Sequence, residues 1–384
     1  MATRVLVVVP VYGGHPHLDA CLASVASLRS TAAAIDTLVI DDGSPEAGFA
    51  AQLGATCAAL GLPHYRSPRN QGIPRTFNLA LRRAQTTGRD HVLLVNSDVI
   101  ASPALVDHLL AARGPDVASV TAWSNQASAF SLDLANRDVR LAAPGNVARV
   151  ADALHARFGD ATLDLPTGAG HCMLLSVAAV ERVGLMDPVF GRGYCEELDW
   201  CQRARLAGMR NVLALGSFVW HRGSATSTSA GVLGRTDTSV PHNEAIIDAR
   251  YPSFRRDVQS FFSVDRFERA KQDALVAAVV HAGRELGWTL QVCGTPRAIA
   301  GDRAVVRVDP VNASAPLQLS WIGLGAAAPA VGDDPLTAAT HLLGGPPADV
   351  QILDTGHVAE LALAAATQQG LAVAVQRPYP SRVI

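Results

Sequence analysis

The sequence contains few charged and few aromatic side chains, and it has no long hydrophobic run. Of its 384 residues 17% are charged and 5% aromatic, whereas 49% are hydrophobic. Such a chain can bury a sizeable core and is too apolar to be disordered. A membrane-spanning helix needs roughly 18–20 unbroken apolar residues, and the best candidate, residues 274–280, is followed at once by His281. We therefore expect no transmembrane segment.

The six cysteines include no Cys-x-x-Cys pair. In a chain of this length, isolated cysteines are typical of reduced, mostly buried thiols and argue against a zinc cluster. The first apolar run ends at Pro10 without a small-residue cleavage site, which is unlike a signal peptide. These features predict a cytoplasmic protein, and they leave a peripheral membrane contact open.

The charge pattern argues against a nucleic-acid ligand, and the loop after the first predicted strand argues against two other classes of enzyme. The 32 basic and 34 acidic residues give a net charge of −2, and no basic run is present, so nucleic acid is not an expected ligand. A dinucleotide-dependent oxidoreductase would carry Gly-x-Gly-x-x-Gly after its first strand, where this chain has Pro10-Val11-Tyr12-Gly13-Gly14. A nucleotidyltransferase would need a glycine-rich, basic loop there and is disfavoured as well.

Strand-like and helix-like segments alternate over residues 4–120. The runs 4–9, 37–40 and 91–95 are apolar throughout, as in strands that are buried on both faces of a parallel sheet. Segments with helical spacing of apolar residues lie between them. This alternation predicts an α/β fold with a mostly parallel sheet, in which ligands bind at the carboxyl ends of the strands.

A change in composition near residues 264–270 indicates a domain boundary. The segment before it is aromatic and charged, and the chain after it is rich in Ala, Val and Gly. A length of 384 residues also favours two domains. We expect one domain over residues 1–265 and a smaller α/β domain over residues 270–384. The second could bind an acceptor, mediate dimerisation into a homo-oligomer, or be part of the next domain of a longer protein.

Acidic and imidazole groups stand at the ends of three predicted elements. One group follows the apolar run 91–95, one opens a predicted helix, and one ends the apolar run 217–220. Carboxylates beside apolar segments are costly unless a metal or a proton transfer uses them, so the pattern indicates one catalytic cleft. The groups are Asn96-Ser97-Asp98, Glu196-Glu197-Leu198-Asp199 and His221.

The first 225 or so residues resemble the family 2 glycosyltransferases, which have the GT-A fold. Asn96 departs from the Asp-x-Asp of that family, and Glu197 replaces an Asp in the Glu-Asp-x-Asp of its rhamnosyltransferase-like members. The resemblance does not extend to residues 270–384. Its landmarks, in chain order, are Val9-Pro10-Val11-Tyr12, Leu38-Val39-Ile40-Asp41-Asp42-Gly43-Ser44, Arg69-Asn70-Gln71-Gly72 with Arg75 and Asn78, Asn96-Ser97-Asp98, Gly191 to Arg203, and Val219-Trp220-His221.

The resemblance implies a nucleotide-diphosphate sugar donor, such as a UDP- or dTDP-sugar. Asp41 and Asp42 would accept hydrogen bonds from base and ribose. The alternative is that these residue types simply form a turn with Gly43 and Ser44. Tyr12 could pack beside the base or be an ordinary half-buried tyrosine. Arg69 and Arg75 could bind phosphate or be exposed to solvent only. The expected donor-binding residues are Pro10, Tyr12, Asp41, Asp42, Arg69, Gly72, Arg75, Asn96 and Ser97.

The resemblance also implies a divalent cation, Mg²⁺ or Mn²⁺, held by Asp98 and His221. A cation that prefers oxygen ligands and retains water needs few protein groups when a diphosphate completes its shell. The alternatives are a turn or helix cap for Asp98 and a structural histidine at the end of a strand. His171, near Gly168 and Gly170, could touch donor or acceptor or pack in the core.

The acidic helix is expected to supply the general base. The resemblance favours Glu197 as the base, with Asp199 second. Glu196 is a further catalytic candidate, and a plain helix-dipole role is the alternative for one of the three. One base on the acceptor side implies direct displacement with inversion. The acceptor would be a glycan, a lipid-linked glycan or a natural product. The rival hypothesis is a catalytically weak module that binds nucleotide-sugar or glycan, with Asn96 and Glu197 as marks of decay.

Overall fold

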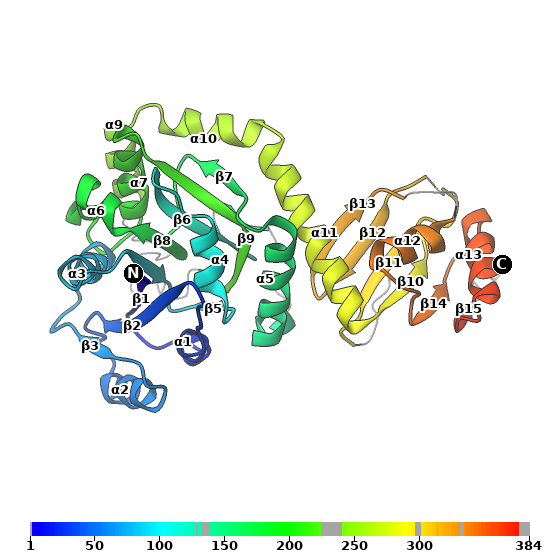
Figure 1. The fold of residues 1–384 in the computed structure, drawn as a ribbon, viewed down its shortest axis with the longest axis horizontal. Coiled ribbons are helices and arrows are strands. Elements are labelled where there is room, and N and C mark those ends of the chain that lie inside the picture. The colour runs from blue at the N-terminus through cyan, green and yellow to red at the C-terminus, as the bar shows by residue number, and fades with distance from the viewer. Residues whose placement is uncertain are drawn as a thin grey trace, which may run out of the picture. The chain divides into compact units, whose positions relative to one another are not determined.

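The computed structural model describes residues 2–127, 130–132, 139–223, 240–295, 301–312, 314–330 and 334–375 (Figure 1). The chain divides into two compact units, one within residues 1–268 and the other chiefly from Arg269 onward. The division into two domains near residues 265–270 stays a prediction, because compactness alone does not show that either unit folds by itself. Each unit is described separately below.

A nine-stranded sheet forms the centre of the first unit within the described residues. Its strand order is β3-β2-β1-β4-β8-β6-β9-β5, and β7 pairs with β9 beside this path. The strands are β1 (Thr3–Val11), β2 (Ala33–Asp41), β3 (His64–Arg66), β4 (His91–Val95), β5 (Val99–Ala101), β6 (Val117–Ser124), β7 (Thr162–Leu165), β8 (Cys172–Ser176) and β9 (Arg210–His221).

Strand direction decides which ends of the sheet carry polar loops. Strands β3, β2, β1 and β4 pair in parallel, so the loops after β1, β2 and β4 leave the sheet at one edge. Strand β8 lies antiparallel between β4 and β6, and β9 pairs with β6 in parallel. The antiparallel pair β5–β9 places His221 opposite Val99, which brings the end of β9 to the loop after β4.

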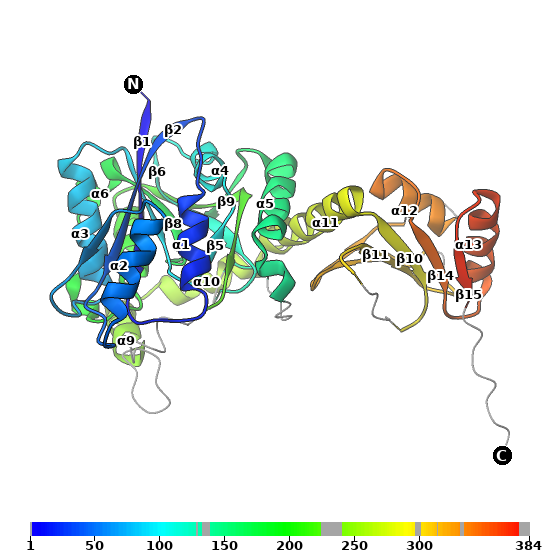
Figure 2. The ribbon, with the colours of Figure 1, turned by 90° about the horizontal axis from the view of Figure 1, so that it is seen from below.

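Helices cover both faces of this sheet (Figure 2). Side chains of β1 alternate between two cores, with Val5 and Val7 in one and Leu6 and Val8 in the other. Burial on both faces is the reason why β1 is apolar along its whole length. The helices of the described first unit, with α11 continuing into the second, are α1 (Leu18–Ala26), α2 (Phe49–Ala59), α3 (Ile73–Thr86), α4 (Leu105–Ala111), α5 (Pro144–Phe158), α6 (Val177–Val183), α7 (Glu196–Leu206), α9 (Val240–Arg250), α10 (Phe254–Ser263) and α11 (Arg266–Leu286), with a 3-10 turn at Pro188–Phe190. A second 3-10 turn, Val139–Ala142, groups mostly with the second unit.

The second unit has its own sheet, in the order β13-β12-β11-β10-β14-β15. Strand β10 pairs in parallel with β11 and β14, and β11, β12 and β13 pair antiparallel. An α/β fold with a second, smaller unit is therefore confirmed. Its elements are β10 (Trp288–Val292), β11 (Ala304–Val308), β12 (Leu317–Trp321), β13 (Leu324–Ala328), α12 (Pro335–Leu343), β14 (Asp349–Ile352), α13 (His357–Gln368) and β15 (Val373–Val375).

None of the helices in these ranges combines the length and the apolar content that crossing a membrane requires. The cysteines are unpaired; five of the six are buried, and Cys195 is partly exposed.

The close approach of Gly72 to the loop before α7 gives a test of the fold. Gly72 has φ of 87°, and a Cβ added there would lie 2.1 Å from the carbonyl oxygen of Gly191 and 2.9 Å from Cα of Arg192. We expect Gly72→Ala to lower the free energy of unfolding by about 2–4 kcal/mol, because backbone strain and a backbone clash add together. Denaturant unfolding measures this loss.

Gly48→Ala is the matched control. Gly48 has φ of 81°, but a Cβ there would meet nothing within 4 Å. Only the left-handed strain applies, which is about 1–2 kcal/mol. Equal losses for the two variants would show that the contact between Gly72 and Gly191 contributes nothing to stability.

Candidate active site

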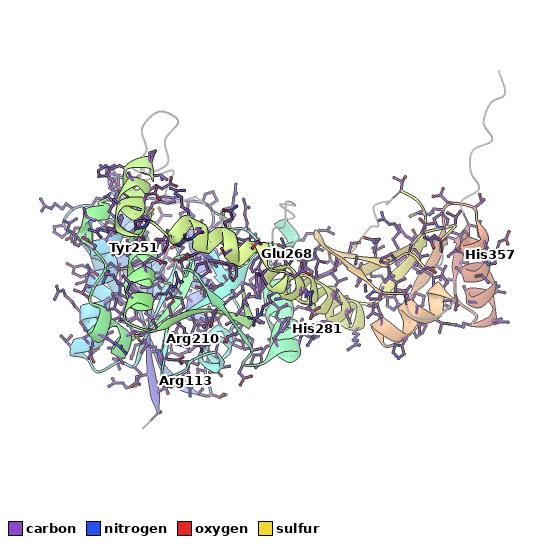
Figure 3. All side chains as sticks on the ribbon, turned by 90° about the horizontal axis from the view of Figure 1, so that it is seen from above. Arg113, Arg210, Tyr251, Glu268, His281 and His357 are labelled. Carbon is purple, nitrogen blue, oxygen red and sulfur yellow. The ribbon has the colours of Figure 1, made fainter. Side chains whose placement is uncertain are left out.

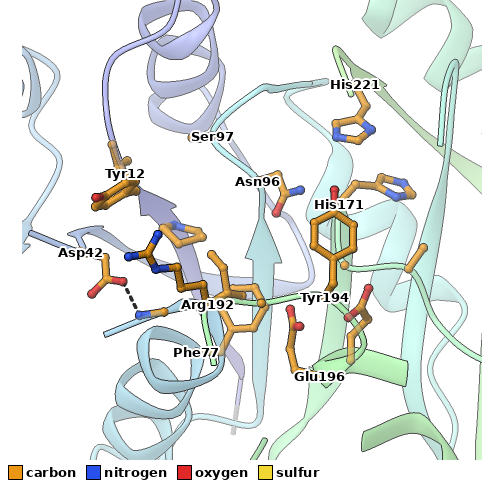
Figure 4. Close-up of a pocket in the computed structure, with 18 of the residues that line it drawn as sticks. Tyr12, Asp42, Phe77, Asn96, Ser97, His171, Arg192, Tyr194, Glu196 and His221 are labelled. Atoms are coloured by element: carbon orange, nitrogen blue, oxygen red, sulfur yellow. Dashed lines mark hydrogen bonds between the residues drawn. The ribbon is translucent and has the colours of Figure 1, made fainter. Parts of the chain in front are cut away.

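A cavity of about 440 Å³ opens where β1, β2 and β4 end. Nine residues that the sequence predicted as site residues line it, and five others do not (Figure 4). Those that line it are Pro10, Tyr12, Asp42, Gly72, Asn96, Ser97, Glu196, Glu197 and His221. Those outside its lining are Asp41, Arg69, Arg75, Asp98 and Asp199.

One wall of the cavity is built around Asp42. Its carboxylate accepts hydrogen bonds from the backbone N–H groups of Gln71, at 3.0 Å, and Gly72, at 2.8 Å. Burial raises the pKa of Asp42, and these bonds partly offset that rise. Asp42 thus ties the loop before α3 to the end of β2, and Tyr12 lies on the same side of the cavity (Figure 4).

Asp41 serves the turn that follows β2 rather than the cavity. Its fully buried carboxylate accepts hydrogen bonds from the backbone N–H of Ser44, at 2.8 Å, and from the hydroxyl of Ser44, at 2.6 Å. Arg66 forms an ion pair with the other oxygen. Arg69 and Arg75 are exposed. Of the two acids in this turn, Asp42 is therefore the one that lines the cavity.

Asp98 and His221 meet beside the cavity. Nε2 of His221 lies 3.4 Å from Oδ1 of Asp98, and Nδ1 of His221 lies 2.8 Å from the carbonyl oxygen of Gln126. A carbonyl can only accept, so Nδ1 carries the proton, and in the neutral ring the lone pair of Nε2 faces the carboxylate. Metal-binding histidines typically have such a carbonyl partner.

The spacing of these two atoms fits a divalent cation. Adjacent ligands of Mg²⁺ lie about 3 Å apart, because each metal–ligand distance is about 2.1 Å. Within the residues that the structure describes, no group of three or more His, Cys, Asp or Glu side chains could hold a metal. Among the described residues, Asp98 and His221 would thus supply two ligands, and a bound diphosphate and water would have to supply others.

A second histidine stacks on His221. The ring centroids of His171 and His221 are 5.2 Å apart, and Nε2 of His171 donates to the carbonyl of Ala122, at 3.2 Å. Burial, with a smaller effect of His221, lowers the pKa of His171 to about 3. His171 is therefore neutral at physiological pH, and it adds no positive charge beside His221 and Asp98.

The opposite wall carries two neighbouring acids in the first turn of α7, the buried Glu196 and the partly buried Glu197. Burial raises the pKa of both groups, and the charge of Glu197 raises that of Glu196 further. Backbone N–H groups of Glu197, Gly170 and Leu198 partly offset the rise at Glu197. Oε2 of each glutamate is buried without a hydrogen-bond partner. Glu197 is therefore the more readily ionised acid, and Glu196 the better proton holder.

Asp199 points away from the cavity into an ionic network. It is fully buried and accepts hydrogen bonds from Arg203, at 2.9 Å, and from Arg250 and Tyr251, both at 2.8 Å. Both carboxylate oxygens are thus committed to partners that fasten α7. This arrangement speaks against Asp199 as a base.

Arg192 and Tyr194 are among the lining residues that received no role from the sequence. Tyr194 has φ of 71°, which is uncommon for a residue with a side chain. The glycines on either side of Arg192 indicate a tight loop, but no sequence pattern predicts a left-handed tyrosine. Their placement follows from the packing of the loop.

Comparisons with known proteins give a family and a set of distant structural likenesses. Residues 3–236 match the family model described as "Glycosyltransferase like family 2". A comparison with curated proteins finds no match.

Three solved structures illustrate the structural likeness. One is GalNAc-T7 with UDP, GalNAc and Mn²⁺, with a TM-score of 0.45, 13% identity, and 57% of this chain and 44% of that chain covered. The mannosyltransferase PcManGT from Pyrobaculum calidifontis with GDP-Man and Mn²⁺ has a TM-score of 0.42 and 15% identity, over 75% of this chain and 76% of that one. S. aureus TarS 1–349 has a TM-score of 0.42 and 14% identity, over 74% and 82%. This chain thus spans less than half of the first structure.

The acid pair makes stability depend on pH in a defined direction. Because the pKa of Glu196 is raised in the folded protein, the stability linked to its proton is fully present below the unfolded pKa of about 4.3 and is lost as the pH rises through the folded pKa. We expect Glu196→Gln, which is neutral at every pH, to be more stable than the parent at pH 8 by about 1 kcal/mol. The difference should vanish towards pH 4.

Urea unfolding from pH 4 to pH 8 measures this difference. Glu181→Gln, which changes an exposed residue of α6, is the control and should alter stability little at any pH. If Glu196→Gln instead destabilised the protein increasingly as the pH rose, the ionised Glu196 would have to make a stabilising contact.

Proposed function

The chain belongs to the family described as glycosyltransferase like family 2, and from this we propose that it transfers a sugar, with inversion, from a nucleotide-diphosphate donor to an acceptor hydroxyl. The first unit has the α/β arrangement expected of a GT-A domain. The observation that carries the proposal is that one cavity has on its walls both the residues expected to bind the donor diphosphate and the residue expected to act as general base. Asn96 and Ser97 line it next to Asp98, and Glu197 lines it as well.

The donor would lie across the ends of β1, β2 and β4. Tyr12 and Asp42 would meet its base and ribose, because they lie together on one side of the cavity (Figure 4). Asn96 and Ser97 lead towards Asp98 and His221 and would lie along the diphosphate. Asn96 is neutral, so the wall facing the diphosphate carries less negative charge than an Asp-x-Asp would give it. We propose a UDP- or dTDP-sugar as donor.

Asp98 and His221 would hold the divalent cation, Mg²⁺ or Mn²⁺. When bound, such a cation neutralises negative charge on phosphate oxygens and makes the diphosphate a better leaving group. His171 stays neutral behind His221, so it neither repels a cation nor competes with it for the diphosphate. The carbonyl of Gln126 keeps the proton of His221 on Nδ1, away from the cation.

Glu197 would act as the general base. The acceptor oxygen attacks the anomeric carbon on the face opposite the diphosphate, and the new carbon–oxygen bond forms as the bond to the phosphate oxygen breaks. The acceptor proton passes to the Glu197 carboxylate, which must be within hydrogen-bond reach of the hydroxyl. A single displacement of this kind inverts the configuration. Glu196 would retain its proton and so reduce charge repulsion beside the base.

The acceptor would present a hydroxyl group to Glu197. A glycan, a lipid-linked glycan or a natural product would each present a hydroxyl, and the aromatic ring of Tyr194 in the lining offers a face on which a sugar could stack. The second unit could bind the acceptor or a second copy of the chain.

Thermal-shift screening against nucleotide sugars, with and without Mn²⁺, tests the donor and the cation together. A donor that stabilises the protein only when the cation is present supports both assignments, because a ligand raises the unfolding temperature according to its affinity for the folded state. A donor that binds without any transfer to a broad acceptor panel would favour the catalytically weak binding module instead.

We expect Glu197→Gln to lower the transfer rate by about 10²–10⁴-fold, because a removed general base typically has this effect. Donor-induced stabilisation should be unchanged, since the amide has the shape of the carboxyl group. Initial rates of transfer measure the loss, with Glu181→Gln as an exposed control. Transfer at the parent rate would remove Glu197 from the mechanism.

We expect Asp98→Asn to weaken the Mn²⁺-dependent part of the donor-induced shift by at least tenfold in apparent affinity, because a neutral amide is a weaker ligand for a divalent cation. Asp19→Asn, an exposed acid in the first turn of α1, is the control. Equal Mn²⁺ titrations for the two variants would place the cation elsewhere.

A further inference from the structure

Helix α9 begins beyond residues 3–236, the part of the chain that matches the family. One of its side chains, Asn243, nevertheless reaches the loop that leads into the acidic helix α7. Asn243 is 2% exposed, and its Nδ2 donates to the carbonyl oxygens of Phe190, at 3.1 Å, and of Gly193 and Tyr194, both at 2.9 Å. Three backbone carbonyls of one loop thus share one amide group.

This loop has an unfavourable backbone. Tyr194 and Cys195 have φ of 71° and 74°, in the left-handed region that residues with a Cβ rarely adopt. Such residues persist only where their surroundings force the conformation, and they cluster at functional sites. The carbonyl of Cys195 accepts the first hydrogen bond of α7, from the N–H of Asp199 at 2.9 Å. The conformation of the loop therefore sets the direction of the turn that bears Glu196 and Glu197.

The other side of the loop contacts the start of α3, next to the cavity wall built around Asp42. The backbone N–H of Ile73 donates to the carbonyl of Arg192, at 3.2 Å, and Gly72 lies against Gly191. The loop is thus held between α3 on one side and α9 on the other. Without the hydrogen bonds from Asn243, the loop would lose its hydrogen bonds on the α9 side.

Helix α9 is also joined by ion pairs to α7 and to the residue before the turn Pro188–Phe190, and these pairs do not involve the loop carbonyls. Arg250 contacts Asp187 and Asp199, each at 2.8 Å, and Tyr251, which follows the helix (Figure 3), donates to Asp199 at 2.8 Å. In addition, Ile247 packs in a small core with Phe190. Docking of α9 therefore has supports other than Asn243, which makes the two roles separable by mutation.

We propose that Asn243 is a positioning residue for the transfer reaction: its amide holds the loop 190–195 in the shape that turns Tyr194 and Glu197 towards the cavity. This inference rests on the proposed function. Its physical basis is that small displacements of a catalytic group reduce rate much more than binding. Asn243 itself does not line the cavity.

The test compares Asn243→Asp and Asn243→Ala with Ile247→Ala. The first keeps the shape of the side chain but removes both N–H donors, the second removes the amide, and the control loosens the packing of α9 without removing a hydrogen bond to the loop. We expect both Asn243 variants to lower kcat about 10–100-fold, with the KM for donor changed less than twofold. The acid limb of the pH–rate profile should move to lower pH, because water admitted around Glu197 lowers its pKa.

Hydrogen exchange gives a readout that does not depend on activity. Backbone amides in residues 190–199 should exchange faster in Asn243→Ala than in Ile247→Ala when the two have similar melting temperatures. If Asn243→Asp does not fold, Asn243→Ser and Asn243→Ala are compared instead. The serine hydroxyl can still donate one hydrogen bond and alanine none, so the loss should be larger in Asn243→Ala.

Two results would overturn the inference. In an active parent, an unmoved acid limb together with a kcat no lower than that of Ile247→Ala would reduce Asn243 to a structural residue. In a parent without transfer activity the proposed function fails on its own, and the inference then fails only if exchange over residues 190–199 is the same in the Asn243 and Ile247 variants.

Discussion

The site depends on the contact between the backbone of Gly72 and that of Gly191 and Arg192. This contact joins the loop after β3, which Asp42 holds against β2, to the loop that starts α7. Two walls built from segments more than a hundred residues apart are thereby set at a fixed separation. A side chain on Gly72 would force them apart, so the cavity requires a glycine at this position.

The cavity is assembled at a cost in stability. Glu196 and Glu197 each bury a carboxylate oxygen without a hydrogen-bond partner, and Tyr194 and Cys195 adopt left-handed backbone. Unpaired buried acids and strained backbone both oppose folding. Two well-packed cores on either face of the sheet supply the stability that permits such a site, and violations of this kind are expected where function requires them.

Neighbouring acids along the chain take different roles because of their partners. Asp41 and Asp42 are adjacent, yet Asp41 is enclosed by Ser44 and Arg66 while Asp42 faces the cavity. Glu197 and Asp199 are two residues apart on one helix, yet Asp199 is neutralised by Arg203 and Arg250. Arg203 is one helical turn from Asp199, but Arg250 and Tyr251 lie about 50 residues later, so the local pattern does not by itself separate the two acids.

The sequence by itself determined the α/β class, the strand ends at which polar groups gather, and the acidic first turn of α7, because periodicity and turn chemistry are local properties. It also contained the ordered motifs that place residues 3–236 in their family. The tertiary structure decided which of these acids face the cavity, that His221 meets Asp98 across the antiparallel pair β5–β9, and that α9 supports the loop before α7. These depend on contacts between distant segments, which a local pattern of residues does not specify.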